Sequence, residues 1–245
     1  MKVVVAGATG FVGTEVIRQA ISHPKITSVI ALARRETAVP EGSVSQADIS
    51  KLKSVVCDDF INYPEHVKAE ISDADACIWL IAVTPAKAKK VPRDGWIQIC
   101  RNYPLAAVEA FSKLNQGKTE PFRFIYVSGS HAERDLDKRR WINGDYRVLR
   151  GQVEVGILDR AEKSNGALTA CVFKPGLINT ASTGILVKGV QAVARLLIGL
   201  SSIQRDEFAA ALLDKAVNGF EKDTYLNEEL IEIGQELLNA QATSE

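Results

Sequence analysis

The sequence opens on residues 1–13, MKVVVAGATGFVG, and this stretch decides the fold. The run Val3–Val5 is apolar and β-branched, which is typical of a strand covered on both faces in a parallel sheet. Glycines follow at Gly7, Gly10 and Gly13, and apolar residues then recur at helical spacing. The stretch therefore predicts a strand, a tight turn and the start of a helix.

Each glycine of this turn has its own physical use. Gly7 permits a turn that a Cβ atom would obstruct, and Gly10 lets the backbone approach a pyrophosphate. Gly13 lets the new helix pack closely against the strand, while free N–H groups at the helix start face the anion. An ordinary tight turn between strand and helix is the alternative. We expect dinucleotide phosphates to contact Gly7, Thr9, Gly10, Phe11, Val12 and Gly13.

The composition suits one compact α/β domain over residues 1–245, with a core at about residues 1–178 and a helical portion at about 179–245. The 245 residues include 30 basic and 30 acidic side chains, so a nucleic-acid binder that works through a strong global field is excluded. The first strand leaves no room for a signal peptide, and the apolar runs are too short to cross a bilayer. We expect a cytoplasmic protein without a membrane partner.

The four cysteines, Cys57, Cys77, Cys100 and Cys171, show no C-x-x-C spacing. Three of them lie in or beside apolar runs, so buried free thiols in a reducing compartment are expected. The histidines show no H-x-x-x-H spacing and no convergent carboxylates, and we expect no metal site.

Periodic segments along the chain predict a doubly wound parallel sheet of six or seven strands with helices on both faces. After the first strand, the expected strands are Thr27–Leu32, Ser54–Cys57, Ala76–Val83, Phe122–Val127 and Leu168–Phe173. The expected helices are Phe11–Ser22, Asp94–Leu114, one that begins near Tyr146, and three that cap the substrate side, Ile185–Leu200, Asp206–Asn218 and Asn227–Asn239.

Two arginines, Arg34 and Arg35, follow directly after the second expected strand. In dinucleotide folds this point meets the adenosine ribose, where an acidic residue suits the free 2′-hydroxyl of NAD and arginine suits the 2′-phosphate of NADP. The position therefore predicts NADP (NADPH) as the cofactor. A solvated basic loop is the alternative.

Tyr146 and Arg150 stand four residues apart on an expected helix, so their side chains share a face. Reduction of a carbonyl needs a proton donor at the oxygen, and a tyrosine can supply it if a neighbouring cation lowers its pKa from about 10. The pair therefore predicts a catalytic site, although an ordinary solvated helix face would show the same spacing.

The order of these motifs resembles the atypical and extended short-chain dehydrogenase/reductase superfamily, especially its NmrA-like and Tat-interacting-protein-like NAD(P)-binding members. The resemblance covers roughly the first three quarters of the chain. The superfamily uses Tyr-x-x-x-Lys, and Arg150 stands here at the lysine position. Arginine keeps the positive charge and can donate to the nicotinamide ribose, but its pKa above about 12 removes it as a proton relay.

The resemblance implies further site residues. The catalytic serine of the superfamily falls within a short window after the fifth strand, so Ser130, or Ser128 beside it, would hold the substrate oxygen. Asp59 would accept from the adenine amino group and Phe60 would cover the ring. The segments expected to border the cofactor are Ala82 and Val83, and Lys174, Pro175, Gly176 and Leu177 against the nicotinamide.

Together these features predict an NADPH-dependent reductase of a small ketone, enone or aldehyde. A protein that senses NADP without turnover, and a non-redox isomerase or cyclase on the same fold, are the alternatives. The small-molecule carbonyl is the expected partner, and the oligomeric state, a homodimer included, stays open.

Overall fold

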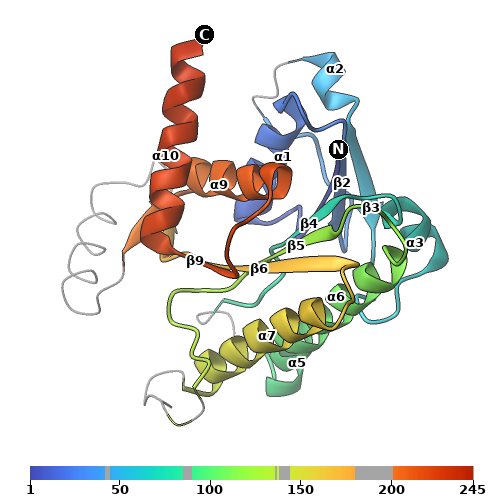
Figure 1. Ribbon diagram of the computed structural model, residues 1–245, viewed down its shortest axis with the longest axis vertical. Coiled ribbons are helices and arrows are strands. Elements are labelled where there is room, and N and C mark those ends of the chain that lie inside the picture. The colour runs from blue at the N-terminus through green and yellow to red at the C-terminus, as the bar shows by residue number, and fades with distance from the viewer. Residues whose placement is uncertain (42–44, 85–89, 136, 138–143, 180–200, 245) are drawn as a thin grey trace.

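A computed structural model of the chain describes residues 1–41, 45–84, 90–135, 137, 144–179 and 201–244 (Figure 1). Seven strands form one parallel sheet in the order β3-β2-β1-β4-β5-β6-β9. They are β1 (Lys2–Ala6), β2 (Ser28–Ala33), β3 (Leu52–Val56), β4 (Ala76–Trp79), β5 (Phe122–Val127), β6 (Leu168–Lys174) and β9 (Thr224–Leu226). The order reverses beside β1, and this switch point is where open α/β sheets bind their ligands.

The helices cover both faces of this sheet (Figure 1). They are α1 (Phe11–Ser22), α2 (Gln46–Ile49), α3 (Glu65–Ile71), α5 (Arg93–Ile97), the π-helix η1 (Gln98–Asn102), α6 (Tyr103–Leu114), α7 (Gly144–Glu162), α9 (Arg205–Asn218) and α10 (Asn227–Ser244). A separate parallel pair joins β7 (Leu177–Asn179) to β8 (Ser202–Gln204). The expected Rossmann-type α/β fold is therefore confirmed.

Strand β1 shows why both faces must be covered. Val3 and Val5 pack toward α1 and α9, whereas Val4 and Ala6 pack toward α3, α6 and α7. All four side chains are 0% exposed, as expected of a central strand whose successive residues point to opposite faces. The run of β-branched residues that marks this strand in the sequence thus forms the centre of two cores.

The C-terminal helices lie on the α1 face. Phe208 and Leu212 of α9 are fully buried in the same core as Val16 and Ile17 of α1, so α9 belongs to the layer that covers the sheet. Helix α10 packs on α9, beside which it stands in Figure 1. The other helix expected in this part of the chain, over residues 185–200, lies outside the described residues.

Two element boundaries differ from the sequence-based expectation, each for a local reason. Strand β4 ends at Trp79 because its partner β1 ends at Ala6. The segment expected as one helix over Asp94–Leu114 begins at Arg93 and contains the π-helix η1. Pro104 accounts for that interruption, because proline has no N–H to donate and its ring clashes with the carbonyl one turn earlier.

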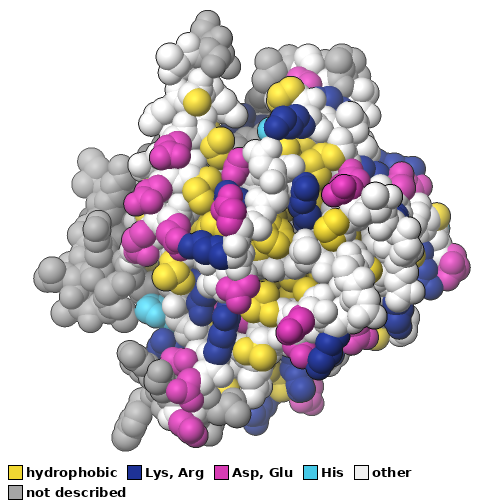
Figure 2. Space-filling view, viewed as in Figure 1, with side chains coloured by type: hydrophobic (Ala, Val, Ile, Leu, Met, Phe, Trp, Pro, Cys, Tyr) yellow, Lys and Arg dark blue, Asp and Glu magenta, His cyan; other side chains and the backbone are white. Residues whose placement is uncertain are grey.

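The surface and the cysteines agree with the composition. Figure 2 shows Lys and Arg side chains interspersed with Asp and Glu over the face seen in Figure 1. All four cysteines are buried free thiols, as expected. Among the helices that the structure describes, none is long and apolar enough to cross a membrane.

Candidate cofactor and active site

The turn after β1 has room for backbone and none for side chains. Gly7 has a φ of +92°, and its N–H donates to the Leu32 carbonyl at 2.9 Å. A Cβ atom on Gly13 would lie 2.4 Å from the Gly7 carbonyl oxygen, and one on Gly10 would lie 3.0 Å from the same atom. The turn and the start of α1 therefore approach each other as closely as glycine permits.

The amino end of α1 offers uncapped donors. The helix begins at Phe11 after Gly10, which makes no side-chain cap, and its first turn holds no acidic residue. The first N–H groups of a helix lack internal partners and carry the positive end of its dipole, so they suit an anion. Thr9, Phe11 and Val12 lie at this end, and the Phe11 side chain is exposed.

The predicted selector arginines lie at the neighbouring strand end. Because β2 pairs in parallel with β1, Leu32 lies opposite Ala6, and Arg34 and Arg35 follow just beyond. Both arginines are exposed, and neither forms an ion pair or a hydrogen bond with another described residue. Their guanidinium groups are therefore accessible to solvent at the strand end beside the glycine turn.

The residues expected around the adenine are only partly placed for that role. The exposed Asp59 carboxylate accepts the N–H groups of Ile61 and Asn62, and these bonds lower its pKa. Phe60 is 1% exposed. Its ring forms a T-shaped contact with the ring of Trp79, with the two ring centroids 5.8 Å apart. The structure thus corrects the expectation that Phe60 covers the adenine, because its ring is packed inside the core.

The chain after β4 is held by two side chains that approach from different helices. The Val83 N–H donates to the Cys100 sulfur at 3.3 Å, and the Tyr146 hydroxyl donates to the Val83 carbonyl at 2.7 Å. Val83 is buried, whereas Ala82 beside it is exposed toward solvent. The sequence did not indicate Cys100 as a partner here, because the contact joins residues 17 positions apart and depends on tertiary packing.

Tyr146 and Arg150 lie on one face of α7, as their spacing predicts. The Arg150 Nη2 atom donates to the Val127 carbonyl at 2.7 Å, and its guanidinium lies 4.9 Å from the centre of the Tyr126 ring. The Arg150 Nη1 atom is buried and has no hydrogen-bond partner among the described residues. It is therefore a donor available to a bound hydroxyl group.

The direction of the Tyr146 pKa corrects the sequence-based expectation. Burial raises the pKa of this hydroxyl, and the neighbouring Arg150, which favours the charged form, offsets only part of that rise. Tyr146 is therefore protonated at neutral pH, as a proton donor must be.

The two candidate serines differ in their hydrogen bonds. The Ser128 hydroxyl donates to the Glu154 carboxylate at 2.5 Å, which uses its one proton. Ser130 is exposed, and its backbone N–H donates to the Pro175 carbonyl at 2.9 Å. Of the two, Ser130 has the side chain that is turned toward solvent.

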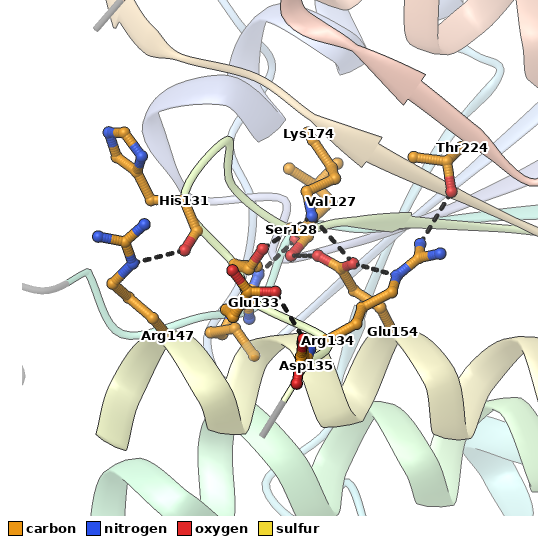
Figure 3. Close-up of polar contacts among 12 residues, drawn as sticks. Val127, Ser128, His131, Glu133, Arg134, Asp135, Arg147, Glu154, Lys174 and Thr224 are labelled. Carbon is orange, nitrogen blue, oxygen red and sulfur yellow. Dashed lines mark hydrogen bonds and ion pairs between the residues drawn. The ribbon is translucent and has the colours of Figure 1, made fainter. Parts of the chain in front are cut away.

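Lys174 joins a buried polar cluster instead of facing open solvent (Figure 3). Its ammonium donates to the Ala132 carbonyl at 2.9 Å and to the Glu154 carboxylate at 3.2 Å. The Arg134 Nε atom reaches the same carboxylate at 2.7 Å. Sequence reasoning gave no role to Glu154 or Arg134, although Glu154 ends the stretch that begins at Tyr146 and stands one further helical turn along the same face.

The chain that leaves β6 crosses closely over its neighbours. A Cβ atom on Gly176 would lie 1.9 Å from the Ser201 carbonyl oxygen, and the Gly176 N–H donates to the Asn227 side chain at 2.6 Å. Leu177 then begins β7 and is partly exposed. Within the described residues, no group of three His, Cys, Asp or Glu side chains could hold a metal ion.

The profile of the NAD dependent epimerase/dehydratase family matches residues 3–133. Protein FMP52, mitochondrial, of Candida albicans is 32% identical over 147 residues, which are 56% of this chain and 61% of that protein. The chain spans less than two thirds of the length of the curated relatives it matches.

Solved structures share the fold. Vestitone reductase from alfalfa superposes with a TM-score of 0.65 at 19% identity, over 92% of this chain and 76% of that one. DesIV, a dTDP-glucose 4,6-dehydratase from Streptomyces venezuelae with NAD and TYD bound, superposes with a TM-score of 0.65 at 15% identity. The match covers 99% of this chain and 81% of that one. The family match and the fold confirm the resemblance to the short-chain dehydrogenase/reductase superfamily, and the NmrA-like subgroup stays a prediction.

The hydrogen bonds of the two serines predict different effects on stability. Ser128→Ala removes a bond to a buried carboxylate and should lower the free energy of unfolding by about 2 kcal/mol. Ser130→Ala alters an exposed side chain and should change it by less than about 0.5 kcal/mol. Urea denaturation followed by circular dichroism measures both, and equal losses would contradict the assignment of Ser128 to Glu154.

Proposed function

We propose a function from one premise: the chain belongs to the NAD dependent epimerase/dehydratase family. The function is that of an oxidoreductase that uses NADPH to reduce a small ketone, enone or aldehyde. The observation that carries the proposal is the glycine turn in front of the uncapped α1 helix, with two exposed arginines at the adjacent strand end that pair with none of the described residues.

The residues present fit an NADP-type dinucleotide. The N–H groups at the start of α1 would hold the pyrophosphate, and Arg34 and Arg35 would pair with the 2′-phosphate. The Nη1 atom of Arg150, for which the described part of the chain supplies no acceptor, would donate to a ribose hydroxyl at the other end of the cofactor. Asp59 would border the adenosine. The chain at Ala82 and Val83 would also border the cofactor.

When bound, the cofactor supplies the hydride, and the chain supplies the proton and the orientation. Ser130 would donate a hydrogen bond to the substrate oxygen. Tyr146 would protonate that oxygen after its hydroxyl leaves the Val83 carbonyl, since hydrogen bonds of catalytic groups commonly rearrange when substrate binds. Its raised pKa keeps the donor protonated at neutral pH.

A second candidate function has its own supporting observation. Tyr146 donates to a backbone carbonyl in the chain after β4, and Arg150 donates to the carbonyl of the last residue of β5, so the pair stabilises the fold without any substrate. A protein that binds NADP, signals its redox state to a partner and turns nothing over would use the pair in this way.

The remaining expectations belong to the same proposal. We place the reaction in the cytoplasm and take a small-molecule carbonyl, with no nucleic acid or membrane surface, as the partner. The balance of 30 basic and 30 acidic residues supports the exclusion of nucleic acid.

The variant Tyr146→Phe tests the catalytic proposal. It removes the proton donor and the bond to the Val83 carbonyl, so NADPH oxidation should fall at least about 100-fold against a panel of small ketones, enones and aldehydes. The dissociation constant of NADPH, measured by fluorescence titration, should change less than threefold.

Unchanged turnover in this variant would exclude Tyr146 as the donor. If the wild type binds NADPH and oxidises none of it against the whole panel, the sensor function replaces the reductase. Lys113→Ala, at the opposite edge of the sheet on the exposed end of α6, is the control and should retain wild-type turnover.

The double variant Arg34→Ala/Arg35→Ala tests the cofactor choice. Loss of two charge-assisted pairs to the 2′-phosphate should weaken NADPH binding by about 30-fold to 100-fold. NADH, which lacks that phosphate, should bind within threefold of wild type. The control Lys113→Ala/Lys163→Ala removes the same charge from two exposed positions, and equal weakening of both cofactors by the arginine variant would refute the 2′-phosphate assignment.

A further inference from the structure

We propose that Glu154 is a positioning residue that fixes the loop carrying Ser130 at the substrate side of the sheet. The role in turnover rests on the proposed function, whereas the role in holding the loop does not. Glu154 is 0% exposed on α7, although a carboxylate is costly to bury unless its oxygens are well paired.

Three donors from different parts of the chain meet this carboxylate (Figure 3). The Ser128 hydroxyl lies 2.5 Å from Oε1, and the Arg134 Nε atom lies 2.7 Å from Oε2. The Lys174 ammonium lies 3.2 Å from Oε2. One carboxylate therefore joins the end of β5, the loop that follows it, and the end of β6.

The donors extend the connection beyond the carboxylate. Arg134 also donates through Nη2 to the Thr224 hydroxyl of β9 at 2.8 Å. Lys174 also donates to the Ala132 carbonyl at 2.9 Å. The loop 128–135 is thus tied to the carboxyl ends of β5 and β6, at the edge where open α/β sheets bind ligands, and to Thr224, the first residue of β9.

Helix α7 holds the same loop by two further contacts. The Arg147 Nε atom donates to the His131 carbonyl at 2.7 Å, and the Arg147 carbonyl accepts the Glu133 N–H at 3.0 Å. Gly151 makes room for the approach, because a Cβ atom there would lie 1.9 Å from the Glu133 carbonyl oxygen. The helix that carries Tyr146 and Arg150 therefore also sets the path of the serine loop.

Ser130 lies between the anchored points of this loop. Ser128 is held on one side by Glu154, and Ala132 is held on the other by Lys174, which itself pairs with Glu154. The loop has its own backbone bond from the Ala132 N–H to the Gly129 carbonyl at 2.9 Å. Loss of the carboxylate should free both ends of the Ser130 segment while the glycine turn at β1 stays intact.

The first experiment measures the loop directly, by hydrogen–deuterium exchange of the full chain. In Glu154→Gln, the amides of Ser130, Ala132 and Glu133 should exchange at least 10-fold faster than in wild type. Amides of β1 should exchange within twofold of wild type. The control is Glu109→Gln on α6, which removes a half-exposed carboxylate that pairs with Arg160 of α7. This variant should leave the exchange of the loop unchanged.

The second experiment separates positioning from stability. Glu154→Gln leaves two cations around a neutral amide, and Glu154→Gln/Lys174→Met restores the net charge of the cluster. We expect Glu154→Gln to lower the melting temperature and the double variant to reverse most of that decrease. The kcat for carbonyl reduction should stay at least 10-fold below wild type in both variants. The KM for NADPH should stay within twofold of wild type in Glu154→Gln.

Each outcome decides the proposal. Wild-type exchange of the loop in Glu154→Gln, or recovery of kcat together with the melting temperature in the double variant, would overturn it. If Glu154→Gln does not fold, the exchange of the double variant is compared with that of Lys174→Met, which removes the bonds of Lys174 to the Ala132 carbonyl and to Glu154 but keeps the carboxylate. Equal exchange of the loop in these two variants would overturn the proposal. Absence of turnover in the wild type would refute the proposed reductase alone, because the exchange of the loop still tests the role of Glu154.

Discussion

The contact between Gly13 and the Gly7 carbonyl is the constraint on which the rest of the site depends. A Cβ atom at Gly13 would lie 2.4 Å from that oxygen, so a side chain there would push α1 away from the turn. The closeness lets the first N–H groups of α1 stand directly behind the end of β1. Because β1 is the strand beside which the order of the sheet reverses, these donors lie where a dinucleotide crosses the sheet.

Helix α7 provides the second half of the site. Tyr146, Arg150 and Glu154 lie on successive turns of one face and bond, respectively, to the chain after β4, the end of β5 and the cluster at the end of β6. These bonds tie the helix, which packs on the Val4 face of the sheet, to chain segments at or just beyond the carboxyl ends of β4, β5 and β6. The same bonds explain why two groups proposed for chemistry are also structural.

Much of this could be predicted from the sequence, because β1 and α1 depend on local periodicity and on glycines at fixed spacing. The proposed pairing of Tyr146 with Arg150 needed only the helical repeat. The burial of Phe60 could not be predicted, since it depends on Trp79 arriving from another strand. The pKa of Tyr146 likewise depends on how deeply tertiary packing buries it, and the Glu154 cluster gathers residues far apart along the chain.

The central claim is that the glycine turn and the start of α1 hold the phosphates of a nicotinamide dinucleotide. Titration of the wild-type chain with NADPH by isothermal calorimetry, beside Gly13→Ala, tests it most directly. The account predicts saturable one-to-one binding to the wild type. In a folded Gly13→Ala protein, it predicts a dissociation constant at least about 30-fold larger. Absence of saturable binding to the wild type, or equal affinity in the two proteins, would contradict it.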